Sequence, residues 1–157
     1  MTEPVVHVVD DDRSFVRALA RLLTANGFEV QAFGSGNELL AAISADSRGC
    51  VVVDLDMPGL DGLQVQEALA ARRIRLPVVF LSGRGDIPSS VHAMRQGAVD
   101  FLEKRAPAEI LLAAIRRAID SDDAHSGLRE RFARLSARER EILGHVVRGR
   151  IDRKSVV

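Results

Sequence analysis

Cysteine is nearly absent from this chain: Cys50 is the only one among 157 residues, so no disulfide can form within the chain. It opens the apolar run at residues 50–53, where a small buried side chain is expected and a reactive thiol is not. Long hydrophobic runs are absent too, since no stretch approaches the roughly 20 apolar residues of a membrane-spanning helix. The N-terminus lacks the basic-then-apolar pattern of a secretory signal. These absences predict a cytoplasmic protein without membrane contact.

Lysine is scarce, because only Lys104 and Lys154 are lysines among the 22 basic residues. Charge is also unevenly spread. Residues 1–126 carry 13 Lys/Arg against 18 Asp/Glu, a net charge of −5, and residues 127–157 carry nine against four, a net charge of +5. An acidic body with a basic end favours two functional parts, although a solvated arginine-rich tail would have the same composition.

Apolar, β-branched segments alternate with segments of helical periodicity along the first 120 residues. Strands are expected at residues 5–9, 28–33, 50–54, 77–81 and 98–103, and helices at 15–25, 36–43, 63–73, 89–96 and 107–120. Five strands that alternate with five helices predict parallel βαβ units and a doubly wound α/β sheet. Residues 121–127 are small and polar, which is typical of a linker or a frayed helix end.

Polar residues directly follow four of the expected strands. They are Asp10, Asp11 and Asp12 after the first, Asp54 after the third, Ser82 after the fourth and Lys104 after the fifth. Each alone has an ordinary explanation: an aspartate commonly caps the next helix, which we expect of Asp12, and a Ser-Gly pair commonly forms a turn. Because the carboxyl ends of parallel strands meet at one edge, their joint placement predicts a single site.

Crowded carboxylates repel one another unless a cation lies between them, and Mg²⁺ prefers such oxygen ligands. A carboxylate can also attack phosphorus and form an aspartyl-phosphate, a reaction that needs charge neutralisation and positioning. We therefore expect Asp54 to be a phosphoryl acceptor. The expected metal ligands are Asp10, Asp11, Asp54 and the backbone carbonyl of Asp56, and the phosphoryl oxygens would be contacted by Ser82 and Lys104.

Residues 4–120 resemble the receiver domain of bacterial two-component response regulators. The resemblance is carried by the segments at residues 8–12, 54–62, 81–83 and 97–104, which are similar to the family's acidic pair, acceptor loop, hydroxyl position and lysine. It implies a flavodoxin-like (CheY-like) sheet of order 2-1-3-4-5, a partner histidine kinase, and no enzymatic activity beyond self-dephosphorylation. Phe101 matches the family's switch aromatic. Phosphorylation would then change the surface of the fourth helix, fifth strand and fifth helix and promote homodimerisation.

Within that family the chain is most similar to the FixJ/NarL type, in which a receiver precedes a LuxR-type helix-turn-helix that regulates transcription. Residues 135–143 resemble the start of that output domain, which implies a receiver at 1–120, a linker or helix extension at 121–134 and an output fragment at 135–157. The chain stops before a recognition helix, so DNA binding is expected of the full-length architecture and not of this chain. The family usually has proline after its lysine. Here Arg105 follows Lys104, and we expect a trans peptide bond and a shifted loop, since a cis non-proline bond costs about 2.5–4 kcal/mol.

Two alternatives remain open at this point. Asp54-Leu55-Asp56 also resembles the Asp-x-Asp motif of haloacid-dehalogenase-type phosphatases, but in those the motif lies on the first strand and the acidic pair comes last. The opposite order favours the receiver. A stand-alone adaptor that acts by protein contact is the other alternative, and the segment after Leu135 argues against it.

Overall fold

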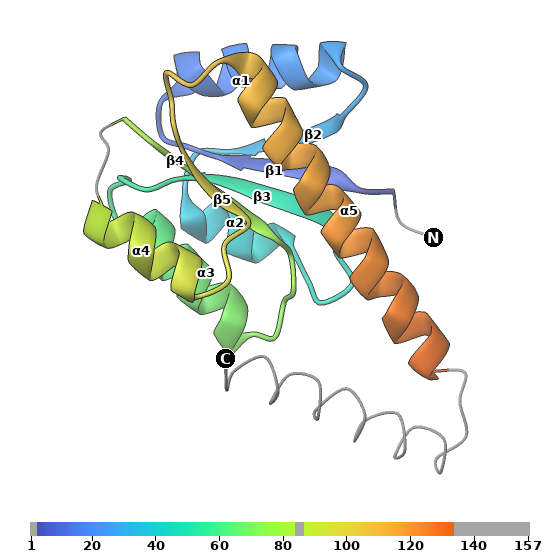
Figure 1. Ribbon diagram of the computed structural model, residues 1–157. Helices are drawn as coiled ribbons and strands as arrows, with labels where there is room; N and C mark the ends of the chain where they lie inside the picture. Colours follow the sequence, from blue (N-terminus) through green and yellow to red (C-terminus); the bar gives the residue numbers. More distant parts are fainter. Residues whose placement is uncertain (1–2, 84–86, 134–157) are drawn as a thin grey trace. The chain divides into compact units, whose positions relative to one another are not determined.

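The computed structural model describes residues 3–83 and 87–133 (Figure 1). The chain divides into two compact units, residues 1–123 and 124–157. The first unit holds the sheet and its helices. Of the second unit, only residues 124–133 are described, as the end of a helix that begins in the first. The output fragment expected at 135–157 lies outside the described residues.

Strands and helices alternate strictly along the first unit. The order is β1 (Val5–Val9), α1 (Arg13–Ala25), β2 (Glu29–Phe33), α2 (Gly36–Ala42), β3 (Gly49–Asp54), α3 (Gly62–Ala71), β4 (Val78–Ser82), α4 (Ile87–Arg95), β5 (Asp100–Glu103) and α5 (Ala108–Ala133). All neighbouring strands are parallel, and their order is β2-β1-β3-β4-β5. The predicted fold class and strand order are therefore confirmed.

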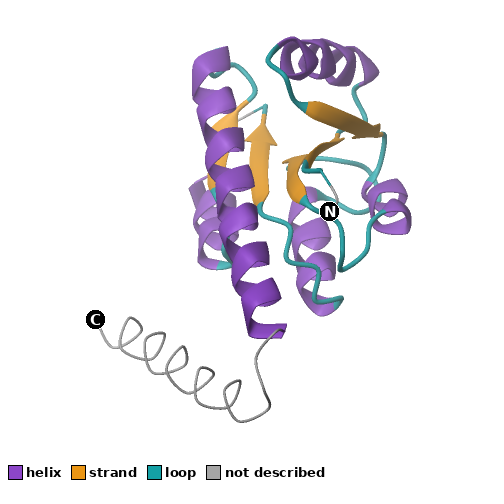
Figure 2. Ribbon diagram, turned by 90° about the vertical axis from the view of Figure 1, so that its right-hand side faces the viewer, coloured by secondary structure: helices purple, strands orange, loops and turns teal. Residues whose placement is uncertain are grey.

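Two hydrophobic clusters cover the two faces of the sheet. One contains Val9, Val51 and Val53 with apolar side chains of α2, α3 and α4, and the other contains Val6 and Val8 with those of α1 and α5. Figure 2 shows the strands lying among the helices. β3 and β4 are buried along their whole length, as expected for parallel strands covered on both faces. The backbone positions that carry the acidic and basic residues at the strand ends are thus held by a rigid, close-packed scaffold.

Helix α5 runs on to Ala133, through residues for which a linker, a frayed helix end or a helix extension was expected (Figure 1). The reason is a long-range contact of Asp122, which is only 5% exposed and follows Ala114 and Ala118 on the buried side of the helix. Its carboxylate accepts a hydrogen bond from the Gly49 N–H at 2.8 Å and pairs with Arg48. Polar composition therefore reflects a buried ion pair at this point and not a break in the helix.

Helix α4 buries little of its own surface. Ala93 is its only buried residue, whereas Ile87, Val91 and Met94 are exposed. The carbonyl of Ala93 accepts a hydrogen bond from the buried side-chain amide of Gln66 on α3, at 3.0 Å. The helix thus presents an apolar stripe to solvent.

Candidate functional site: an acidic pocket at the carboxyl edge of the sheet

Four strand ends bring the predicted polar residues to one edge of the sheet. Asp10 follows β1, Asp54 is the last residue of β3, Ser82 is the last residue of β4, and Lys104 follows β5. Asp10, Asp54 and Ser82 are 2%, 5% and 0% exposed, so the site is set into the surface. Ser82 was expected just beyond its strand. It lies within it, because its position pairs with Glu103 of β5.

Local structure fixes the two aspartates before any ligand is considered. The side chain of Asp10 accepts a hydrogen bond from the Asp12 N–H at 3.0 Å, and Asp12 itself caps α1 by accepting from the Phe15 N–H, as predicted. Asp54 is held by the packing of α3, whose first residue lies in close contact with the end of β3. A Cβ atom at Gly62 would lie 2.7 Å from the carbonyl oxygen of Asp54, so glycine is needed for this close approach.

Three carboxylates form a group able to hold a metal ion. One oxygen each from Asp10, Asp11 and Asp54 lies within 4.8 Å of the others. Two oxygens bound to one Mg²⁺ lie at most about 4.2 Å apart, since each bond is about 2.0–2.1 Å long. A bound Mg²⁺ would draw together any pair of these oxygens that lies farther apart than this, and Asp11 is the exposed member of the three. The pocket therefore fits a small, hard divalent cation.

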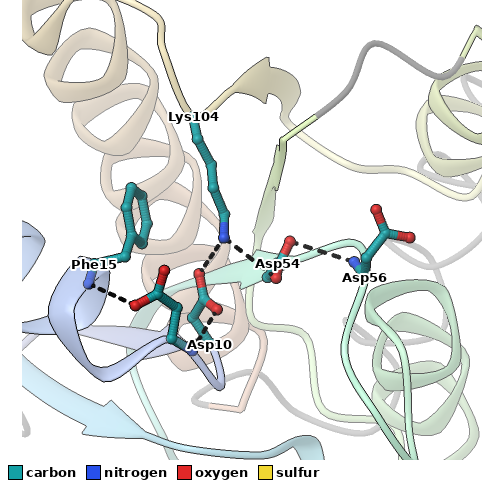
Figure 3. A network of polar contacts seen from close by, with 6 residues as sticks. Asp10, Phe15, Asp54, Asp56 and Lys104 are labelled. Carbon is teal, nitrogen blue, oxygen red and sulfur yellow. Dashed lines mark hydrogen bonds and ion pairs between the residues drawn. The ribbon is translucent and has the colours of Figure 1, made fainter.

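Lys104 spans the two buried aspartates. Its Nζ atom lies 2.7 Å from Asp10 Oδ2 and 3.3 Å from Asp54 Oδ2 (Figure 3). Its backbone N–H donates to the Ser82 carbonyl at 2.8 Å, which ties the residue to the end of β4. The described residues contain no cis peptide bond, so the bond from Lys104 to Arg105 is trans, as predicted. The lysine reaches the pocket without a proline after it.

The pocket makes the Asp54 carboxylate easier to protonate than a carboxylate in water. Burial and the neighbouring charge of Asp10 raise the pKa of Asp54 to about 6, against the opposing effect of Lys104. Burial alone would lower the pKa of Lys104, but its contacts with Asp10 and Asp54 outweigh burial and raise that pKa. At neutral pH Asp54 is thus mostly an ionised carboxylate, held at an energetic cost that a second cation would relieve.

Asp56 and Phe101 lie at the margins of the pocket. The Asp56 N–H donates to Asp54 Oδ1 at 3.3 Å, while the Asp56 carboxylate is exposed and points away from Asp54 (Figure 3). Phe101 on β5 is half-buried, and its ring stacks on Phe80 with centroids 5.9 Å apart. The switch role expected of Phe101 stays a prediction.

Phe15 is a site residue that the sequence argument did not find. Its helical spacing predicts only a place on the apolar side of the first helix. In the structure its ring centroid lies 4.6 Å from Lys104 Nζ. A signal was available in principle. Phe15 falls in the first turn of the helix that follows the acidic residues, and that turn lies at the same edge of the sheet.

The fold and the pocket together define a doubly wound domain with a buried aspartate, an acidic pair and a lysine at its switch-point edge. Residues 6–116 match the family described as "Response regulator receiver domain". The chain is 39% identical over 160 residues to nodulation protein W of Bradyrhizobium diazoefficiens, covering 98% of this chain and 70% of that protein. It is 38% identical over 164 residues to the transcriptional regulatory protein FixJ of Rhizobium meliloti, covering 99% and 79%.

A solved structure gives the same answer. The response regulator StyR superposes with a TM-score of 0.79 at 37% identity, covering 94% of this chain and 78% of that one. The chain therefore belongs to the receiver-domain family of two-component response regulators. Receivers of this family act with histidine kinases, often in proteins that bind DNA, and are generally not enzymes. Among the described residues, no helix is long and apolar enough to cross a membrane.

Proposed function

We propose that this receiver is a phosphorelay acceptor in which Asp54 takes a phosphoryl group from a phosphohistidine of a partner histidine kinase. The observation that carries the proposal is the grouping of a buried Asp54 carboxylate with Asp10, Asp11 and Lys104 in one pocket. In the transfer, an Asp54 oxygen attacks phosphorus. The P–N bond to the histidine breaks, and its electron pair stays on the imidazole nitrogen.

Asp10, Asp11, Asp54 and the backbone carbonyl of Asp56 would hold Mg²⁺, which when bound neutralises charge on the phosphoryl oxygens. The chain's own residues do the rest. Asp10 and Asp54 hold the Lys104 ammonium over the acceptor, where it can donate to a phosphoryl oxygen. The Ser82 hydroxyl, at the adjacent strand end, donates to another. Attack of water on phosphorus then breaks the P–O bond to Asp54, which releases inorganic phosphate and returns the free carboxylate by self-dephosphorylation.

The switch we propose is a shift of the α4–β5–α5 surface. When Ser82 engages the phosphoryl group, Phe101 turns inward and the exposed stripe of Ile87, Val91 and Met94 rearranges to favour a homodimer. We further propose the boundaries given above, with a receiver at 1–120, a helical connection at 121–134 and part of an output domain at 135–157. DNA would be bound by the full-length output domain, in the cytoplasm.

The test is phosphorylation by a small donor. The chain is incubated with acetyl phosphate and Mg²⁺, and its intact mass should rise by one phosphoryl group. Asp54→Asn should take up none, and the matched exposed control Asp46→Asn should behave as the wild type. Uptake by Asp54→Asn would overturn the assignment. Sustained turnover of a generic phosphomonoester would argue for a phosphatase instead.

A further inference from the structure

We propose that Phe15 is a positioning residue that holds the Lys104 ammonium group over the acidic pocket through its aromatic ring. The use of that lysine in phosphoryl transfer rests on the function proposed above, whereas the contact itself does not. Nothing in the reaction requires an aromatic group at residue 15, and the role follows from where α1 places the ring (Figure 3).

Lys104 reaches the pocket on a long, flexible stem. Its backbone is fixed, because its N–H donates to Ser82 and the Ala106 N–H donates to the Glu103 carbonyl at 3.0 Å. The four side-chain torsions beyond Cα remain free to choose other rotamers, and fixing them costs conformational entropy. The lysine side chain is 20% exposed, so solvent competes for its ammonium group. Contacts around the ammonium decide where it points.

Three groups surround that ammonium. Asp10 and Asp54 lie on the pocket side, and the Phe15 ring lies 4.6 Å away, within the distance at which a ring face attracts a cation. The ring is itself held in place. Phe15 is half-buried against the cluster under α1 and lies in the first turn of that helix, where its N–H donates to the capping side chain of Asp12. Phe15 is therefore a fixed surface against which a flexible side chain can rest.

The ring differs from the carboxylates in one respect that matters for catalysis. The pull of Asp10 and Asp54 on the lysine changes whenever a cation or a phosphoryl group enters the pocket, because their charges are then shared. The quadrupole of the Phe15 ring does not change. Such a contact is worth about 0.5–1 kcal/mol at a partly exposed site, so its loss should slow phosphoryl transfer about two- to fivefold.

The chain's scarcity of lysine makes a direct test possible. With only two lysines, lysine labelled with ¹³C at Cε gives two signals, and Lys154→Arg identifies that of Lys104. In the wild type the Hε protons of Lys104 should be shifted upfield by the ring current of Phe15. Phe15→Leu, which keeps apolar bulk, should remove the shift, and Phe15→Tyr should keep it. An unchanged shift in Phe15→Leu would overturn the proposal.

The second measurement is the phosphorylation rate with acetyl phosphate and Mg²⁺. Phe15→Leu should be about two- to fivefold slower than the wild type, and Phe15→Tyr should restore the rate to within about twofold. If Phe15→Leu is as fast as Phe15→Tyr, the ring does not position the lysine for transfer. If the wild type takes up no phosphoryl group, the proposed function fails while the NMR result still decides the contact. Should Phe15→Leu not fold by circular dichroism, Phe15→Met replaces it in both arms.

Discussion

Replacing Asp54 with asparagine should make the metal-free protein more stable at neutral pH. The folded chain holds the ionised Asp54 carboxylate in a buried pocket beside Asp10, and this raises its pKa from 3.8 to about 6. At about 1.4 kcal/mol per pKa unit, a shift of roughly two units sets an upper bound near 3 kcal/mol for the cost of ionisation in the folded state. Asparagine resembles the protonated acid and escapes that cost. The favourable contact with Lys104 is already counted in the shift. Because asparagine reproduces the protonated acid only in part, we expect a gain of about 1–2 kcal/mol, which is below that bound.

The sign of the pH dependence follows from linkage. A folded pKa above the unfolded one means that the folded chain binds more protons between about pH 4 and 6, so the stability of the wild type falls as pH rises through that window. Above this pH window the loss of stability caused by the ionised Asp54 is complete, and below the window that loss is absent. The advantage of Asp54→Asn should therefore be present at pH 7.5 and disappear near pH 4.

Urea unfolding, followed by circular dichroism at both pH values with a chelator present, measures the difference. The exposed Asp46→Asn serves as the matched control and should change little at either pH. Added Mg²⁺ should stabilise the wild type more than Asp54→Asn, which shrinks the gap. An Asp54→Asn protein that is less stable than the wild type at pH 7.5, or equally advantaged at both pH values, would refute the reasoning.

Three further changes test other parts of the structure. Asp122→Ala leaves the Gly49 N–H without its side-chain acceptor and removes one of the two carboxylates that pair with Arg48, so it should cost about 1–3 kcal/mol and speed hydrogen exchange in residues 119–133. Gly62→Ala forces a Cβ against the Asp54 carbonyl, and it should cost about 1–3 kcal/mol in urea unfolding and slow phosphorylation. Asp56→Asn removes an exposed negative charge near the acceptor, and it should change the decay rate of the phosphorylated protein by about threefold.

Each of these three predictions has a control variant or a result that would contradict it. Asp120→Ala, an exposed aspartate on the same helix, should leave exchange in α5 as in the wild type, and equal exchange in Asp122→Ala would contradict the role of the buried carboxylate. Gly34→Ala meets only the flexible Glu38 side chain at 3.6 Å and should be nearly neutral. For Asp56→Asn, a decay rate identical to that of the wild type would show that the extra charge has no effect.

The sheet and the edge that carries the site could be predicted because both follow from local patterns. Buried parallel strands are continuous apolar runs, and topology alone brings Asp10, Asp54 and Lys104 to one edge. For residues 121–134 the sequence predicted either a linker or a helix extension, and composition alone could not decide between them. The polarity of Asp122 is the same in a linker and in a buried ion pair, and only its distant partner at the start of β3 distinguishes the two.

Phe15 was missed for a related reason. A periodic apolar position in a helix predicts burial, and nothing local says that part of the ring will lie against a lysine some 90 residues away. Pairwise contacts between residues far apart in sequence are set by how elements pack, at a precision of ångströms that hydrophobic periodicity does not carry. The chemistry of the pocket was therefore predictable in its residue types and not in all of its neighbours.

The sparse anchoring of α4 has a consequence for how little free energy is needed to move it. Ala93 is the one buried residue of the helix, and its carbonyl accepts the Gln66 hydrogen bond, whose net worth is about 0.5–1.5 kcal/mol. Elements with so few buried contacts open locally at a small fraction of the global stability. A shift of a few kcal/mol, as one new charged group in the pocket can supply, is enough to reverse which of two helix positions most molecules occupy. In the switch proposed above, the rigid sheet would keep the acceptor in place while the sparsely buried helix changes position.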